Sequence, residues 1–147
     1  MPLRLLLAIA ALLIHLPGAA QTRHLASLDD AKRVAEGIVA SVAAGNYAGA
    51  IKELRPLSVI PASDFDLFEA QFNNQLGNLL RQFGEPSGQE FIRQDLFGSR
   101  MARYQFAVFH DKSILRWSFV FYKSAKGWVI SHFAFDGNAM AFFPSGT

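Results

Sequence analysis

The stretch of sequence that decides the fold is residues 100–122, RMARYQFAVFHDKSILRWSFVFY. Apolar and polar side chains alternate in it with a period of two, which is typical of strands that bury one face. Turn-forming residues at 110–113 interrupt the alternation, and so short a connection predicts that the two strands pair antiparallel. One set of alternate positions carries most of the apolar bulk: Ala102, Tyr104, Phe106, Val108, Leu115, Trp117, Phe119 and Phe121.

Two more strands are predicted, one on each side of this pair. Residues 90–97 precede it across a Gly-Ser turn, and residues 128–135 follow it across a turn at 123–127. Short loops between consecutive strands predict an antiparallel meander of four strands. Alternation leaves several apolar side chains on the second face of this sheet: Phe109, Val120, Tyr122 and either Phe133 or Trp128.

Two helices are predicted before the strands, from apolar residues that recur at helical spacing. The first begins after Ser27, which has the spacing of a capping box with Asp30, and it ends at Gly45. Asn46 is expected to cap a second, shorter helix. Pro56 ends that helix, because proline has no N–H group to donate.

A third helix is the longest one that the sequence predicts. Ser63 and Asp66 have the spacing of another capping box, and the helix ends at Gly84. Helices followed by a run of strands predict an α+β domain, with three N-terminal helices packed on one face of an antiparallel sheet. The apolar stripe of the third helix consists of Phe65, Phe68, Phe72, Leu76, Leu79, Leu80 and Phe83.

The first twenty residues have the layout of a secretory signal peptide. Arg4 supplies a positive charge, and residues 5–16 form an almost wholly apolar run that is too short to cross a bilayer as a helix. Small residues at Gly18 and Ala20 predict cleavage before Gln21, the alternative being an uncleaved anchor. We therefore expect export to the periplasm or the extracellular medium, with no stable membrane anchor after cleavage. The mature chain then consists of a flexible lead (21–27), one domain (28–138) and a C-terminal tail (139–147).

Composition narrows the class of protein further. The 147 residues include no cysteine, so disulfides and lipoprotein acylation are excluded and the core alone must hold the domain. Loss of Arg4 leaves 13 of the 14 basic residues against 12 acidic ones. These basic residues are scattered along the chain, whereas nucleic-acid binders usually cluster them, so we expect no nucleic-acid partner.

The order of three helices and four strands, ending in Gly127-Trp128-Val129-Ile130-x-x-Phe133, resembles the nuclear-transport-factor-2-like superfamily. Within that superfamily the pattern is similar to exported bacterial domains of unknown function. The resemblance covers residues from about Leu28 to Phe135, and it implies a cone-shaped α+β fold with a curved sheet. Members include isomerases, cyclases and dehydratases as well as non-catalytic binding and dimerisation modules. No stretch here matches a catalytic motif of the superfamily, so the resemblance carries over no catalytic residue.

The histidines and carboxylates are the first candidates for chemistry. His110 lies beside a hairpin turn, where we expect it to be exposed. His132 shares a predicted strand face with Trp128 and Ile130 and is expected to point inward, either as a hydrogen-bonded core residue or as a general base. Asp95 and Asp136 lie at strand ends, where aspartates are usually solvated turn residues. No pair of histidines has ligand spacing and no serine lies in a nucleophile elbow, so we expect no metal, no cofactor and no catalytic residue.

The aromatic residues are the most unusual feature, with 14 phenylalanines. They predict either an apolar pocket inside the domain or simply a core filled by large side chains. The candidate ligand-binding residues are Phe72, Tyr104, Phe106, Trp117, Phe119 and His132.

Three functions follow as expectations. The first is an exported, non-catalytic domain that binds a small apolar ligand or a protein partner. The second is a small cone-fold enzyme of the isomerase or hydratase type, and the third is a dimerising structural module of the cell envelope. We expect a homodimer through the second face of the sheet, unless the tail covers that face with Met140, Phe142 and Phe143.

Overall fold

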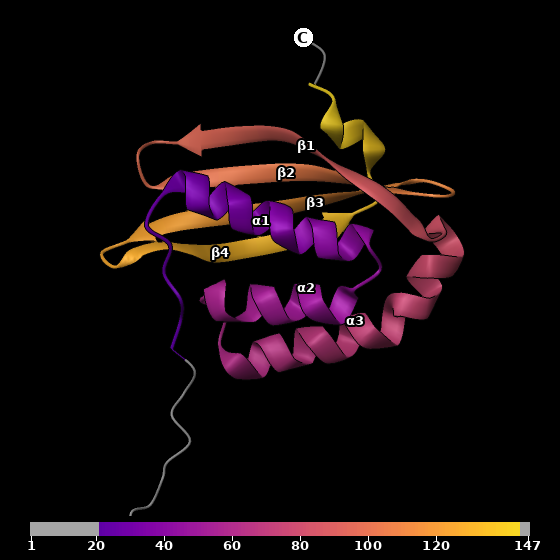
Figure 1. The fold of residues 1–147 in the computed structure, drawn as a ribbon, viewed down its shortest axis with the longest axis horizontal. Coiled ribbons are helices and arrows are strands. Elements are labelled where there is room, and N and C mark those ends of the chain that lie inside the picture. Colours follow the sequence, from indigo (N-terminus) through magenta and orange to yellow (C-terminus); the bar gives the residue numbers. More distant parts are fainter. Residues whose placement is uncertain (1–20, 145–147) are drawn as a thin grey trace, which may run out of the picture.

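The computed structural model describes residues 21–144, and the predicted signal peptide lies outside these residues. Within them the chain forms an α+β domain, as the sequence predicts, with the helices before the strands in chain order (Figure 1). The elements are α1 (Leu28–Ala43), α2 (Tyr47–Leu54), the 3₁₀ helix η1 (Arg55–Leu57), α3 (Ala62–Phe83), β1 (Pro86–Phe97), β2 (Met101–His110), β3 (Ile114–Ser124), β4 (Gly127–Asp136) and the 3₁₀ helix η2 (Ala139–Phe142).

The strands form one antiparallel sheet in the order β1-β2-β3-β4, which confirms the predicted meander. The register places Phe106 of β2 between Phe91 of β1 and Trp117 of β3. Directly opposite residues share a face of the sheet, so large aromatic side chains of neighbouring strands gather on one face. β1 begins at Pro86, earlier than expected, because the turn-forming residues 86–89 pair with the end of β2 instead of forming a loop.

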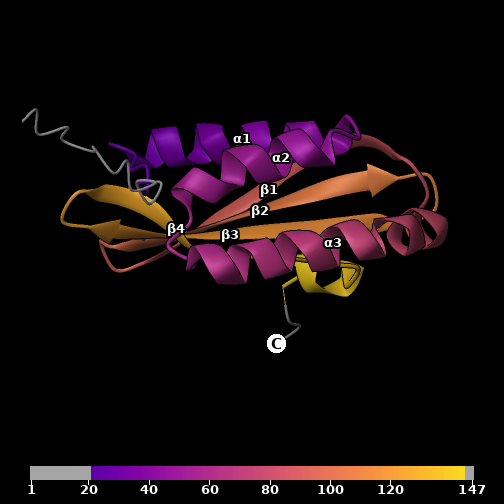
Figure 2. The same ribbon diagram turned by 90° about the horizontal axis from the view of Figure 1, so that it is seen from below.

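The two ribbon views show how the helices and the C-terminal tail lie relative to the sheet. Helices α1 and α2 lie on one side of the sheet, and η2 lies on the other side (Figures 1 and 2). We call the face toward α1 the inner face and the opposite one the outer face. Helix α3 packs along β4, where the rings of Phe65 and Phe68 lie with their centroids 6.0 and 4.9 Å from that of Phe133.

A β-bulge in β4 changes which side chains of this strand face the helices. Val120 of β3 pairs with His132, whereas the adjacent Phe121 pairs with Ile130. Ser131 is therefore the extra residue, and it reverses the alternation along the rest of β4.

The bulge corrects two expectations. His132 does not share a face with Trp128 and Ile130; its side chain is exposed on the outer face. Neither Trp128 nor Phe133 belongs to the outer face, because Trp128 is buried in the core and Phe133 packs against the same core. Without the extra residue, strict alternation would have forced one of the two outward.

The first two helices begin at the predicted caps. The Ser27 hydroxyl accepts a hydrogen bond from the Asp30 N–H at 3.1 Å and donates one to the Asp30 carboxylate at 2.8 Å. The Asn46 side chain accepts from the Gly49 N–H at 3.0 Å. Both caps satisfy N–H groups that the first turn of a helix leaves free.

The cap predicted for the third helix is wrong. Helix α3 starts at Ala62, with Pro61 as the cap residue, and Ser63 lies exposed inside its first turn. The Pro61 carbonyl accepts from the N–H groups of Asp64 and Phe65, both at 3.0 Å, so the helix starts without a side-chain cap. No helix within residues 21–144, α3 included, is long and apolar enough to cross a membrane.

The lead at residues 21–27 is partly paired with the rest of the domain. Leu25 is buried and exchanges two backbone hydrogen bonds with Trp128, at 2.9 and 2.8 Å. The Arg23 N–H also donates to the Pro56 carbonyl at 2.6 Å. The lead therefore adds a short stretch of pairing to the edge of β4, which the polar composition of the segment did not indicate.

Candidate functional site

Of the six candidate ligand-binding residues that the sequence analysis named, five lie in the core. Phe72, Tyr104, Phe106, Trp117 and Phe119 are buried, and their rings contact one another directly or through one further ring. The centroid distances are 6.1 Å for Phe106–Phe119, 6.4 Å for Trp117–Phe119, 4.8 Å for Trp117–Phe135 and 5.6 Å for Phe72–Phe135, and Phe91 joins Tyr104 to Phe106 at 6.4 and 5.5 Å.

The space beside two of these rings, Phe72 and Trp117, is too small for a ligand. A cavity of about 10 Å³ lies between α1, α2, α3 and β3, and Phe72 and Trp117 line it together with Tyr47. Sites for drug-sized ligands enclose about 300–1,000 Å³, whereas a single water needs about 10–15 Å³. The side chains therefore fill the interior as a core, although Tyr47 Oη and Trp117 Nε1 have no hydrogen-bond partner within the described residues.

Two buried tyrosines are poor candidates for acid–base chemistry. Burial, and then the negative charge of Glu85, raise the pKa of Tyr47. Burial, and then Asp29, raise the pKa of Tyr104, whose hydroxyl donates to the Leu28 carbonyl at 3.0 Å. Both phenols therefore stay protonated at neutral pH, and that of Tyr104 is committed to a structural hydrogen bond.

The two strand histidines occupy the reverse of their expected positions. His110 is buried rather than exposed, with its Nδ1 atom 2.8 Å from the Gly84 carbonyl and its ring against Phe83. This happens because the chain between α3 and β1 closes over the β2–β3 turn, where the Asp111 N–H donates to the Glu85 carbonyl. His132 is exposed and lies outside the aromatic cluster. Among residues 21–144 no three histidine, aspartate or glutamate side chains come together in a way that could hold a metal ion.

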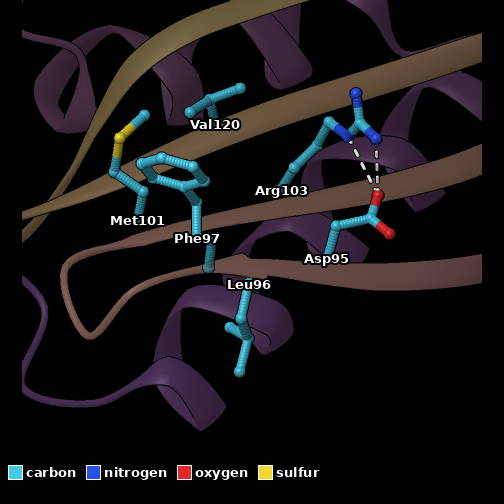
Figure 3. Close-up of a pocket in the computed structure, with 7 residues that line it drawn as sticks. Asp95, Leu96, Phe97, Met101, Arg103 and Val120 are labelled. Carbon is cyan, nitrogen blue, oxygen red and sulfur yellow. Dashed lines mark hydrogen bonds and ion pairs between the residues drawn. The ribbon is translucent and has the colours of Figure 1, made fainter.

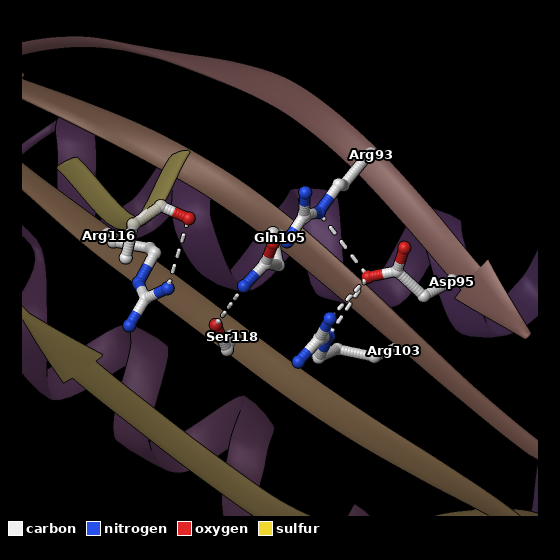
Figure 4. Close-up of polar contacts among 7 residues, drawn as sticks. Arg93, Asp95, Arg103, Gln105, Arg116 and Ser118 are labelled. Carbon is white, nitrogen blue, oxygen red and sulfur yellow. Dashed lines mark hydrogen bonds and ion pairs between the residues drawn. The ribbon is translucent and has the colours of Figure 1, made fainter. Parts of the chain in front are cut away.

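The outer face carries a polar network across its middle (Figure 4). Gln105 is only 2% exposed; its amide oxygen accepts from Arg93 Nε at 2.7 Å and its amide nitrogen donates to the Ser118 hydroxyl at 3.2 Å. Asp95 lies 2.7 Å from Arg103 Nη2 and 3.4 Å from Arg93 Nε. These side chains satisfy one another, so they form a closed structural network rather than an open polar site.

A second ion pair ties the tail to the outer face. Arg116 Nη2 lies 2.8 Å from Asp136, and its Nη1 donates to the Ala141 carbonyl of η2 at 3.4 Å. Burial would raise the pKa of Asp136, but hydrogen bonds from Arg116 and from the Asn138 N–H outweigh it and hold this pKa below its ordinary value. The tail therefore covers the outer face near Arg116, although Met140 remains largely exposed.

A group of exposed apolar side chains lies elsewhere on the outer face, at the β1–β2 turn. Phe97, Met101, Val120 and Tyr122 form it, and we call these four residues the outer patch. Phe97 pairs with Met101 and Met101 with Tyr122, so they form one row across three strands. Phe97 is 80% exposed. A depression of about 280 Å³ lies among Phe97, Met101, Val120 and the Asp95–Arg103 pair (Figure 3).

The turns beside the outer patch carry positive charge. A second, shallower depression of about 360 Å³ is lined by Ser99, Arg100, Lys123 and Ser124, from the β1–β2 and β3–β4 turns. The Arg100 guanidinium lies 5.3 Å from the centroid of the Tyr122 ring and donates to the Lys123 carbonyl. Within residues 21–144 neither Arg100, Lys123 nor Lys126 forms a salt bridge. We call these three cations the basic rim.

The sequence predicted two of the four residues of the outer patch. Alternation placed Val120 and Tyr122 on this face, and the structure confirms both. It missed Phe97 and Met101, whose signal was present: residues that flank a short turn pair with each other and share a face. Met101 is adjacent to the inward-facing Ala102 and therefore has to point outward.

Comparison with known proteins adds no relative. No family model matches the chain, and neither a curated protein nor a solved structure matches it.

Proposed function

We propose that this is an exported, non-catalytic binding domain of the nuclear-transport-factor-2-like superfamily with a curved sheet, and that it binds through its outer patch. The order of helices and strands supports the superfamily. The observation that carries the proposed binding mode is the contrast between a filled interior and an exposed apolar row on the outer face. Monomeric proteins rarely leave large contiguous apolar patches open, so an exposed one marks an interaction surface.

The filled interior weighs against a ligand or a substrate that is bound between the helices and the sheet. A small apolar ligand has no room between Phe72, Trp117 and Tyr47, where the cavity is about 10 Å³. An isomerase or hydratase would also need a buried acid or base beside its substrate. His132, the expected candidate, is exposed on the other face of the sheet.

Oxidation of methionine inside the cell tests the proposal, because the chain carries a matched pair of methionine probes. Met101 belongs to the outer patch, whereas Met140 lies in η2 and is 74% exposed. If a partner covers the patch, Met101 will oxidise more slowly relative to Met140 in intact cells than in the dilute purified protein. The same ratio in both settings would overturn the proposal.

A homodimer is the second candidate, and one observation favours it. Val120 and Tyr122 lie on the outer face as expected for a dimer, and Phe97 and Met101 extend them into one patch. A two-fold axis through this patch would let it pair with itself. Sedimentation at micromolar concentration, with a chain that ends at Asn138 as comparison, tests this candidate. A monomer in both cases would exclude it.

A further inference from the structure

We propose that the partner of the outer patch is an anionic lipid surface, on which the two turns at this end of the sheet dock reversibly. This inference rests on the proposed use of the outer patch for binding and names its occupant. Both turns, β1–β2 and β3–β4, lie at the same end of the sheet, on the left of Figure 1. They form the part of the domain that would meet a flat surface first.

The two most exposed apolar residues at this end, Leu96 and Phe97, form a tip beside the depression of about 280 Å³. Leu96 and Phe97 are 61% and 80% exposed, and they point to opposite sides of β1 (Figure 3). Met101 and Tyr122 continue the row behind Phe97. Side chains of this type insert at the boundary between lipid headgroups and acyl chains, where the tyrosine hydroxyl can remain hydrated.

The charge beside the tip favours anionic lipid over a second copy of the chain. Arg100 and Lys123 line the depression between the turns, and Ser99 adds a hydroxyl group there, whereas the Ser124 hydroxyl already donates to the Gly127 carbonyl at 2.9 Å. Cations and hydroxyls of this kind complement the phosphate of a lipid headgroup. The carboxylate next to the outer patch, Asp95, is already paired with two arginines. A two-fold dimer would instead bring two basic rims to one interface, where like charges repel.

Binding to vesicles tests this inference directly. The protein is recovered from its own cells and its N-terminus is sequenced, so that every variant is compared in the same processed form. It is then sedimented with vesicles of phosphatidylglycerol and phosphatidylcholine in equal parts, or of phosphatidylcholine alone. We expect binding to the anionic vesicles that weakens as salt is raised, because the attraction is screened.

Matched variants test whether binding depends on the residues at this end of the sheet or only on the net charge of the protein. Lys123→Gln/Lys126→Gln should weaken binding by about 25-fold, at about fivefold for each cation near the surface. Arg81→Gln/Lys112→Gln removes the same charge at the opposite end of the sheet and should leave binding within about twofold. Phe97→Ser should weaken binding on the order of tenfold, because its ring no longer enters the lipid.

A fluorescent variant reports the depth of insertion. Tryptophan emission in Phe97→Trp should shift to the blue on anionic vesicles and be quenched by brominated acyl chains. Equal effects of the two charge variants, or an unshifted emission, would overturn the inference. Protection of Met101 in cells without vesicle binding would overturn the lipid partner and leave the outer patch as a binding surface for another partner, such as a second copy. If Met101 is not protected from oxidation in intact cells, the proposed function itself is wrong.

Discussion

The two faces of the sheet are made by the same strands, but they differ in packing, in polarity and in the exposure of their apolar side chains. On the inner face the aromatic rings contact one another and leave a cavity of about 10 Å³. On the outer face, polar side chains bind one another across the middle, and the apolar residues at one end have no cover within residues 21–144. The inner face therefore accounts for stability, and the outer face is where binding is to be sought. Substitutions on each face test this division.

The largest expected effect is at Phe72 of α3, which packs against the inner face through Phe135. This side chain is 6% exposed, and its ring contacts Tyr47, Phe68 and Phe135. Phe72→Ala should lower the free energy of unfolding by about 3–5 kcal/mol, because it removes apolar burial and leaves a cavity. Denaturant titration of the purified variant measures the change.

The control for Phe72 is a phenylalanine on the outer face. Phe97→Ala removes the same atoms from a side chain that is 80% exposed, so the change should stay within about 0.5 kcal/mol. Similar losses for the two variants would mean that the outer patch is part of the core and would erase the difference between the faces.

An intermediate effect is expected in the polar network of the outer face. Gln105→Ala should cost about 1–2 kcal/mol, because Arg93 and Ser118 each lose a partner in a largely buried place. Glu90→Gln, on the same face but exposed, serves as the control and should cost almost nothing. If Gln105→Ala leaves the free energy of unfolding unchanged, water replaces these hydrogen bonds readily and the whole outer face behaves as open surface.

Asp136 is expected to make a smaller, pH-dependent contribution. Its pKa is lower in the folded protein than its ordinary value of 3.8, so its stabilising effect is present above pH 3.8 and is lost as the pH falls through the folded pKa. Asp136→Asn should lower stability at neutral pH by no more than about 1 kcal/mol, because the pair with Arg116 is partly exposed. The difference from the unchanged protein should shrink toward pH about 3. Unfolding curves at both pH values check this, and a constant difference would contradict it.

Periodicity in the sequence predicted the fold well because it depends on many residues at once. The alternation in residues 100–122 averages over two whole strands, and the stripe from Phe65 to Phe83 averages over a helix of 22 residues. A single atypical residue does not change either pattern. Buried positions such as Phe72, Tyr104 and Phe119 were therefore predictable.

The failures of sequence reasoning depend on one residue or on contacts between distant segments. One extra residue, Ser131, moved His132 to the outer face, and alternation alone gives no sign of such a bulge. The burial of His110 depends on Gly84, which is 26 residues away in the chain. Whether the aromatic side chains enclose a pocket is likewise a matter of packing, which composition does not determine.

The smallest expected effect is at His132, and it tests whether the bulge assigns this residue to the correct face. His132 lies opposite Val120 on the outer face and is exposed. His132→Gln should change the free energy of unfolding by less than about 0.5 kcal/mol and leave the protection of Met101 in cells as it was.

The buried His110 is the comparison for His132, because the same substitution there should lower stability. Its Nδ1 atom lies 2.8 Å from the Gly84 carbonyl, so His110→Gln should cost about 1–2 kcal/mol in the same unfolding experiment. If His132→Gln is the more damaging of the two, the bulge at Ser131 is misplaced and His132 faces the helices. The inner face would then hold a titratable side chain beside the aromatic cluster. A base in that position would reopen the case for an enzyme, since general acid–base groups contribute on the order of 10²–10⁴-fold to a rate.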